Sequence, residues 1–227
     1  MISYYGSKSK IVNLYPKPTK DIIIEPFAGS ARYSLKYWEK DVLLVDKYDV
    51  IIDMWHWLQQ ASIKDLENLP KLKLGDCLDN FNLSRGEFLF LSFIVNEGNT
   101  GLRKTVTKRA APKVQFKINK TKEILHKIKH WKINLGSYEE IENLEATWFI
   151  DPPYYKGGEY YPKSNKDIDF NFLGEWCKNR NGEVIVCEND NANWLPFLPL
   201  KEHWGGIKKS VEVVYLQGFK KNKLELF

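Results

Sequence analysis

Short apolar runs alternate with helical segments in the first sixty residues, and this alternation is the strongest constraint on the fold. Residues 21–25 form a β-branched run that ends at Pro26, which is typical of a buried strand followed by a tight turn. Residues 42–45 form a second such run, and residues 31–38 between the two runs have helix-compatible spacing. A second helix is indicated by apolar residues that recur every three or four positions, namely Ile51, Met54, Trp55 and Leu58. This order predicts a parallel sheet in an α/β fold.

The alternation returns in the last third of the chain. Residues 147–150 predict a strand that ends at Asp151, and residues 170–177 predict a helix. Further strands are expected at residues 183–187 and 211–216, the second of them paired with the segment around Trp204.

The rhythm is lost between residues 61 and 131, which we therefore interpret as an inserted subdomain. Residues 84–95 are strongly apolar and predict a helix, whereas residues 96–112 predict a loop. Residues 120–131 predict a second helix whose inward side chains are Ile124, Leu125 and Ile128.

The composition is that of a soluble globular protein, with 43% hydrophobic and 28% charged residues among 227. No apolar run approaches the roughly 20 residues that a membrane span needs, and residues 1–8 lack a signal-peptide core. Three widely spaced cysteines and a paired His126 and His130 without further ligands argue against a disulfide framework or a metal site. These features, with many Lys, Asn and Ile residues, favour the cytoplasm of a bacterium or a phage-infected host.

The positive charge is concentrated in the inserted segment. Residues 98–132 contain eleven basic residues and one acid, a net charge of +10. Because the whole chain carries +5, the remaining residues carry −5. Basic segments of this kind bind phosphate backbones, although a lysine-rich solvated surface has the same composition.

The sequence Asp151-Pro152-Pro153-Tyr154 is the most specific signal, since a given tetrapeptide occurs by chance in about one of a thousand chains of this length. It leaves the carboxyl end of an apolar strand, where open α/β sheets place their ligands. A carboxylate and a rigidly held proline carbonyl can accept the two hydrogens of an aromatic amine, which localises its nitrogen lone pair. Tyr154 can stack on a base rotated out of a duplex. The alternative interpretation is a stiff turn after a strand.

This tetrapeptide resembles the catalytic motif of amino-methyltransferases, and its Asp is similar to that of the DNA adenine N6 group. The resemblance implies catalytic roles for Asp151, Pro152 and Tyr154, with S-adenosylmethionine as methyl donor and no covalent intermediate. The order of segments is similar to the class whose DNA-reading region lies between the cofactor and catalytic motifs.

The segment after the first strand is similar to the motif with which this family holds the methionine part of the cofactor. It consists of Glu25, Pro26, Phe27, Ala28, Gly29 and Ser30, followed by Ala31 where the family usually has a second glycine. Asp46, at the end of the second strand, is placed to accept hydrogen bonds from ribose hydroxyls, as acids do in nucleotide-binding α/β folds.

Two further segments complete the resemblance. Tyr4, Gly6 and Lys8 match the aromatic-x-Gly-x-Lys segment that opens these enzymes, which implies cofactor contacts. Ser137 occupies the place where the family often has an Asp near the cofactor adenine.

The resulting prediction is a site-specific DNA adenine N6-methyltransferase that acts on a flipped adenine in double-stranded DNA. Residues 1–60 and 132–227 form a Rossmann-like catalytic domain, and residues 61–131 a mainly helical DNA-recognition insertion. The expected DNA contacts are Asn99, Arg103, Lys104, Lys108, Arg109 and Lys113, with Asn96 and Thr100 as further base-reading candidates. The alternatives are an RNA adenine methyltransferase and, given Ala31 and Ser137, a DNA-binding relative with weakened catalysis. A nicotinamide-dependent oxidoreductase is disfavoured because the Gly-x-Gly-x-x-Gly fingerprint is missing.

Overall fold

The computed structural model describes residues 8, 11–97, 101–205 and 208–219, and it leaves the side chains of 202–210 undescribed. Seven strands of this described part form one mixed sheet, and they are β1 (Ile22–Glu25), β2 (Asp41–Asp46), β3 (Lys132–Leu135), β4 (Ala146–Ile150), β5 (Gly182–Asn189), β6 (Leu198–Gly205) and β7 (Lys208–Gln217). Their order is β3-β2-β1-β4-β5-β7-β6. The first five run parallel, while β7 is antiparallel to β5 and β6. This mixed sheet, parallel in its first five strands and combined with helices, confirms the predicted α/β fold class.

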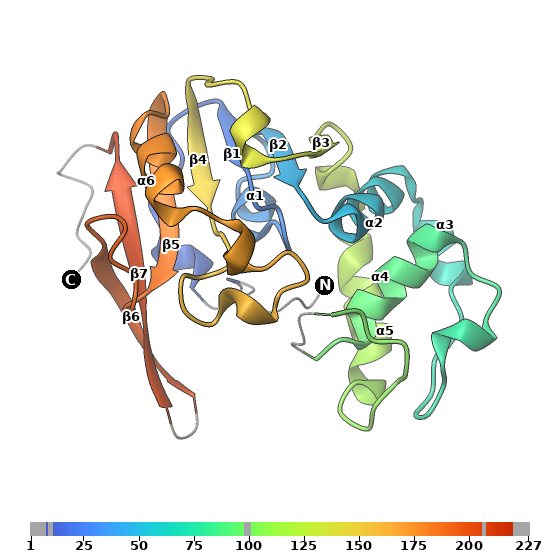
Figure 1. Ribbon diagram of the computed structural model, residues 1–227. Coiled ribbons are helices and arrows are strands. Elements are labelled where there is room, and N and C mark those ends of the chain that lie inside the picture. Colours follow the sequence, from blue (N-terminus) through green and yellow to red (C-terminus); the bar gives the residue numbers. More distant parts are fainter. Residues whose placement is uncertain (1–7, 9–10, 98–100, 206–207, 220–227) are drawn as a thin grey trace.

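The central strands are buried on both faces, which explains their continuous apolar runs. Alternate residues of each strand belong to two different cores. Ile23 and Phe149 belong to the core that includes α1 (Arg32–Lys36), whereas Ile24 and Trp148 belong to the core that includes α6 (Phe170–Lys178). Because successive side chains of a strand point to opposite faces, α1 and α6 lie on opposite faces of the sheet (Figure 1).

The remaining α-helices gather beyond the β2–β3 side of the sheet, opposite the β6–β7 edge (Figure 1). They are α2 (Asp49–Gln60), α3 (Ile63–Asn68), α4 (Arg85–Val95) and α5 (Val114–Lys122). The α4 helix begins where Ser84 and Glu87 form a capping box. It packs on α2, with the rings of Trp57 and Phe90 5.1 Å apart. One continuous core joins α4 and α5 to the sheet, so the division into two domains stays a prediction.

The helix predicted at residues 120–131 was wrong in its placement. The chain instead forms α5 at residues 114–122, immediately after a short 3-10 helix whose first turn contains Pro112, a residue that favours the start of a helix. Val114, Ile118 and Thr121 form its buried face. Residues 123–131 continue as turns, although Ile124, Leu125 and Ile128 are buried as expected.

Short 3-10 helices connect the main elements. They are η2 (Val12–Leu14), η3 (Leu78–Asn80), η4 (Ala111–Lys113), η5 (Leu125–Lys127), η6 (Tyr138–Glu140), η7 (Gly158–Tyr160) and η8 (Asn165–Asp167). Because the first five strands of the sheet are parallel, the segments that follow β1, β2, β3 and β4 all emerge at the same edge. Side chains from the ends of these strands and from the segments after them, together with Lys8, form the candidate site.

Candidate functional site

The turn between β1 and α1 is held in an unusual backbone conformation. Gly29 and Ala31 both have φ of +44°, a region that glycine enters freely and alanine enters at a cost. The Gly29 amide donates a hydrogen bond to Asp46 Oδ2 at 3.1 Å, and the Gly29 carbonyl accepts one from Trp55 Nε1 at 3.0 Å. The turn is therefore fixed by contacts from the end of β2 and from α2.

Asp46 closes β2 as predicted and faces the turn. Its Oδ1 accepts a hydrogen bond from the Tyr48 amide at 2.9 Å. Burial raises the pKa of Asp46 to about 6, against the lowering effect of the Tyr48 and Gly29 amides. The carboxylate is thus an acceptor oriented by backbone groups, as a ribose-binding acid must be.

Glu25 ends β1 and is almost fully buried. Its Oε1 accepts a hydrogen bond from the Ser34 amide at 2.7 Å. Burial is the main cause that raises the pKa of Glu25 to about 8, and the Ser34 hydrogen bonds only partly offset it. At neutral pH this carboxyl is therefore largely protonated, and a neighbouring cation would favour its ionised form.

One open pocket of about 1000 Å³, a volume that includes the solvent at its mouth, brings these residues together. Its lining includes most of the predicted cofactor residues and the predicted catalytic carboxylate, namely Lys8, Glu25, Pro26, Phe27, Gly29, Ser30, Asp46 and Asp151. Segments more than 100 residues apart in the sequence thus meet in one cavity. Tyr4 and Gly6 lie outside the described residues.

Ser137 does not line this pocket. Its hydroxyl accepts a hydrogen bond from the Glu139 amide at 3.4 Å and caps η6, and the residue lines a second groove beside β2 and β3. The next residue, Tyr138, lines the main pocket, with its ring 5.4 Å from that of Phe27. The cofactor role of Ser137 therefore stays a prediction, and η6 places the neighbouring Tyr138 in the main pocket.

Asp151 lies beside Lys8 at the carboxyl end of β4. Lys8 Nζ is 2.8 Å from Asp151 Oδ1, and the Asp151 side chain remains 23% exposed. Burial raises the pKa of Asp151 to about 6, with Lys8 acting in the opposite direction. The carboxylate is therefore ionised at neutral pH and accessible from the pocket.

Tyr154 contributes its hydroxyl to a buried network and is absent from the described pocket lining. The hydroxyl donates a hydrogen bond to Glu212 Oε1 on β7 at 2.7 Å and accepts one from Lys8 Nζ at 2.5 Å. Pro152 is buried and is likewise absent from this lining. The sequence analysis missed Glu212, although an acid within the apolar run 211–216 was a signal for a buried polar role.

The loop that follows the tetrapeptide covers part of the same pocket and was also missed. Its lining residues are Tyr161, Lys163, Ser164, Asp167 and Ile168. Other lining residues that the sequence analysis did not assign are Arg32, Lys47, Tyr48 and Phe149. The last four of these unassigned residues are aromatic or charged and lie within a few residues of the recognised motifs, and this proximity could have indicated them.

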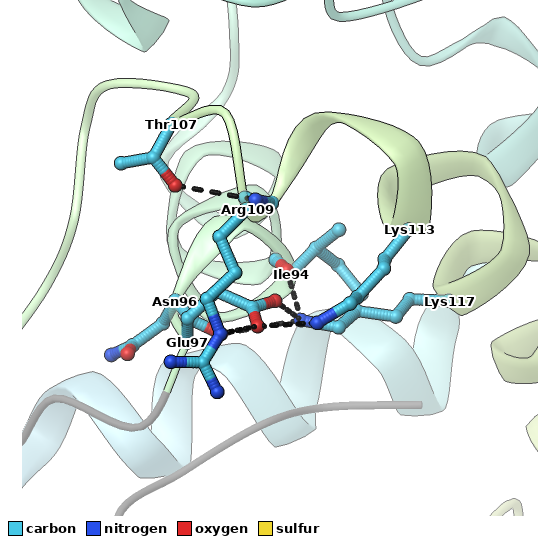
Figure 2. Close-up of polar contacts among 8 residues, drawn as sticks. Ile94, Asn96, Glu97, Thr107, Arg109, Lys113 and Lys117 are labelled. Atoms are coloured by element: carbon cyan, nitrogen blue, oxygen red, sulfur yellow. Dashed lines mark hydrogen bonds and ion pairs between the residues drawn. The ribbon is translucent and has the colours of Figure 1, made fainter.

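The basic segment is organised around one acid, Glu97, at the end of α4. Lys113 Nζ and Arg109 Nε lie 2.8 Å and 3.3 Å from Glu97 Oε2, and Lys117 Nζ lies 3.0 Å from Oε1 (Figure 2). Lys117 also donates to the Ile94 carbonyl at 2.7 Å. Arg109 and Lys113 are exposed, so they combine an ordered position with access to solvent.

The other predicted DNA contacts differ in their surroundings. Lys104 is exposed and pairs with Asp79 at 3.0 Å, and Lys108 is exposed. Arg103 is half-buried, while Asn99 and Thr100 lie outside the described residues. Asn96 is fully buried and donates to the Gly101 carbonyl at 2.9 Å, so it holds the loop and is inaccessible to a base.

Comparisons with known proteins find a weak structural likeness. The chain is similar to the Escherichia coli protein yhhF, described as a methyltransferase (TM-score 0.37, 11% identity, 94% of this chain and 81% of that chain). It is also similar to the rRNA methyltransferase aviRa from Streptomyces viridochromogenes (TM-score 0.35, 10% identity, 87% of this chain and 79% of that chain). These values are too low to bear on activity or substrate. No protein-family model and no curated protein sequence matches the chain.

In the described part of the chain, no helix combines the length and the apolar composition that a membrane span requires. No group of three or more His, Cys, Asp or Glu side chains there is placed to hold a metal ion.

Proposed function

We propose that this protein is an S-adenosylmethionine-dependent DNA adenine N6-methyltransferase. The observation that carries the proposal is the meeting of Asp151 with the Gly29 turn and Asp46 in one pocket. A donor pocket and a carboxylate suited to an amino group are thereby adjacent, which is the requirement for transfer between two bound substrates.

The pocket residues fit the chemistry of the cofactor. Asp46 would accept hydrogen bonds from the ribose hydroxyls, and the Glu25 carboxyl would face the cationic amino-acid part. Tyr138 and Phe27 offer apolar rings for the adenine. When bound, the cofactor supplies an electrophilic methyl group.

Asp151 would activate the acceptor amine. Its carboxylate would accept a hydrogen bond from one N–H of the exocyclic amino group of adenine, and the Pro152 carbonyl would accept one from the other N–H, which favours a localised lone pair on nitrogen. For Tyr154 to stack on the flipped base, its hydroxyl would have to break the hydrogen bond to Glu212 so that the ring could move. Tyr161 already lines the pocket and is the better-placed aromatic contact.

The Glu97-centred cations would bind the DNA backbone. Arg109 and Lys113 are held in place by one carboxylate yet remain exposed, and preordered cations lose less side-chain entropy on binding a phosphate. Lys104 and Lys108 extend the exposed basic surface along the same loop.

The test is transfer of labelled methyl groups from S-adenosylmethionine to duplex DNA and, in parallel, to structured RNA. We expect label in duplex DNA, abolished by Asp151→Ala with the circular dichroism spectrum unchanged. Labelling of RNA alone would assign the alternative RNA adenine methyltransferase. DNA binding without calorimetric binding of S-adenosylmethionine would assign a relative with weakened catalysis.

A further inference from the structure

Glu212 contacts three residues from separate parts of the chain, and one of them, Lys8, also pairs with Asp151. Its Oε1 accepts hydrogen bonds from Tyr154 Oη at 2.7 Å and from Tyr15 Oη at 2.8 Å. The same oxygen lies 3.5 Å from Lys8 Nζ. The Glu212 side chain is only 10% exposed, so these contacts form in a weakly screened environment.

Lys8 lies between two carboxylates. It pairs with Asp151 at 2.8 Å and with Glu212 at 3.5 Å, and its ammonium lies 4.6 Å from the centre of the Tyr154 ring. Both carboxylates attract the same ammonium group, so the charge on either acid weakens the electrostatic interaction of Lys8 with the other acid. The charge on Glu212 therefore affects Asp151 directly and through Lys8.

The groups that face Asp151 come from several elements. Lys8 favours its ionised form, and Glu212 disfavours it. The Asp151 charge also acts on Tyr154, on the Cys187 thiol of β5, and on three groups further off, Tyr15, Glu25 and Glu188. Glu212 is the one anion that shares both Lys8 and the hydroxyl of Tyr154 with this site, among the described residues.

Another buried glutamate provides a structural comparison. Glu183 on β5 is almost fully buried and accepts hydrogen bonds from Thr19 Oγ1 and Thr147 Oγ1, both at 2.6 Å. Its partners are neutral and it is absent from the described lining of the main pocket. Glu183 therefore has the burial and the strand location of Glu212 without a link to Asp151.

We infer that Glu212 is a positioning residue of the methyl-transfer site, an inference that rests on the proposed function. Its carboxylate fixes the hydroxyl of Tyr154 and the ammonium of Lys8, and its charge sets the balance between Lys8 and Asp151. The strand β7 thereby contributes to a site whose other residues lie in parallel strands and their loops.

Two substitutions separate the two effects of Glu212. Glu212→Gln keeps an acceptor oxygen for Tyr154 and Tyr15 but removes the charge, so Asp151 should ionise more easily and the acid limb of activity should move to lower pH. Glu212→Val removes the acceptor as well, and kcat should fall about tenfold or more with the KM for S-adenosylmethionine nearly unchanged. Glu183→Gln is the matched control, and it should leave the pH profile in place.

The experiment measures kcat, KM and their pH dependence for the wild type, both Glu212 variants, Glu183→Gln and Asp151→Ala. Carboxyl ¹³C NMR titration of Asp151, assigned by its loss in Asp151→Ala, follows ionisation without any need for activity. The inference is supported if Glu212→Gln lowers both the titration midpoint of Asp151 and the pH of the acid limb of activity, while Glu183→Gln changes neither. Identical profiles in Glu212→Gln and the wild type would overturn it. An inactive wild type would refute the proposed function instead, while the titration would still decide whether Glu212 controls Asp151.

Discussion

In the proposed reaction Asp151 must be ionised to accept a hydrogen bond from an amine, yet burial favours its neutral form. Burial raises its pKa to about 6, which still leaves the carboxyl ionised at neutral pH. We predict that kcat/KM, which reports the free enzyme, rises with pH and levels off above about pH 7. At about pH 5, one unit below this pKa, the rate should be about tenfold lower. A flat profile between these limits would show that Asp151 does not act as an ionised group.

Glu25 gives a second residue-level prediction, on cofactor binding. With a pKa of about 8, its carboxyl is largely protonated in the free protein near neutral pH. A cationic ligand beside it favours ionisation, so binding of S-adenosylmethionine at about pH 7.5 should release up to about 0.8 of a proton per site. Asp46, with a pKa of about 6, is already ionised there and should add little. Calorimetry in buffers of different ionisation enthalpy measures the release.

The control for this prediction is Glu25→Gln, which has no proton to lose. Its binding enthalpy should not depend on the buffer. If the wild type behaved in the same way, the Glu25 carboxyl would not face the cationic part of the ligand.

At the residue scale, sequence motifs predicted the groups that lie at strand ends. Glu25, Asp46 and Asp151 follow apolar runs directly, so their places in the sheet follow from the strands. Ser137 was assigned by position in a resemblance, and the short η6 helix put Tyr138 into the pocket instead. For Glu212 the acid within the apolar run 211–216 indicates burial, but its partners become known only when β7 pairs with β5 beside Tyr154.

Among the elements, the β1–α1 turn shapes the main pocket, where we propose that S-adenosylmethionine binds. Gly29 has φ of +44° and lines the pocket, so Gly29→Ala should cost about 1–2 kcal/mol of unfolding free energy and weaken S-adenosylmethionine binding. Thermal unfolding and calorimetry measure the two effects. A Gly29→Ala protein with unchanged stability and affinity would contradict this account of the turn.

The matched variant is Ala31→Gly at the neighbouring position with the same φ. Relief of about 1–2 kcal/mol of backbone strain should offset the loss of one buried methyl group, about 0.8 kcal/mol. Stability should therefore not fall. The departure from the family glycine at this position is compatible with an intact pocket, because Ala31 adopts the conformation that a glycine would.

The elements themselves were predicted to different degrees. Buried strands such as β4 are recognisable because both faces are covered and the run is wholly apolar. The α5 helix was misplaced because its buried face is short and polar residues surround it. In residues 120–131 the periodic apolar residues Ile124, Leu125 and Ile128 are buried in turns and a short 3-10 helix. Buried turns and a buried α-helix give the same spacing of apolar residues, so the sequence pattern does not distinguish them.

At the scale of the whole molecule, the basic segment is less positive than its sequence indicates. Acids from outside the segment fold back onto it, since Glu67, Asp79 and Glu97 pair with its lysines and with Arg109. Charge counts along the chain cannot reveal such pairing, because the partners are brought together by α3, η3 and α4. Exposed cations of the segment include Arg109 and Lys113 beside Glu97, and Lys104 and Lys108 in the loop that follows Glu97.

We predict that DNA binding weakens with salt and that Arg109 and Lys113 contribute to this dependence. The double substitution Arg109→Gln and Lys113→Gln should lower the slope of log K against log salt by about 1 for each lost phosphate contact. Lys178→Gln on α6 removes an equally ordinary surface ion pair, with Glu175, and serves as control. Fluorescence anisotropy at several salt concentrations measures the slopes. Equal slopes for the double variant and the control would place the DNA elsewhere.

We propose that Asp151 holds the amino nitrogen of adenine in place for a methyl group from S-adenosylmethionine bound in the Asp46 pocket. Mass spectrometry of nucleosides, after the protein has acted on unmethylated duplex DNA, identifies the atom that is methylated. We predict N6-methyladenine in DNA treated with the wild type and none after treatment with Asp151→Ala. Methylation at another atom, or equal amounts of N6-methyladenine from both proteins, would refute this role of Asp151.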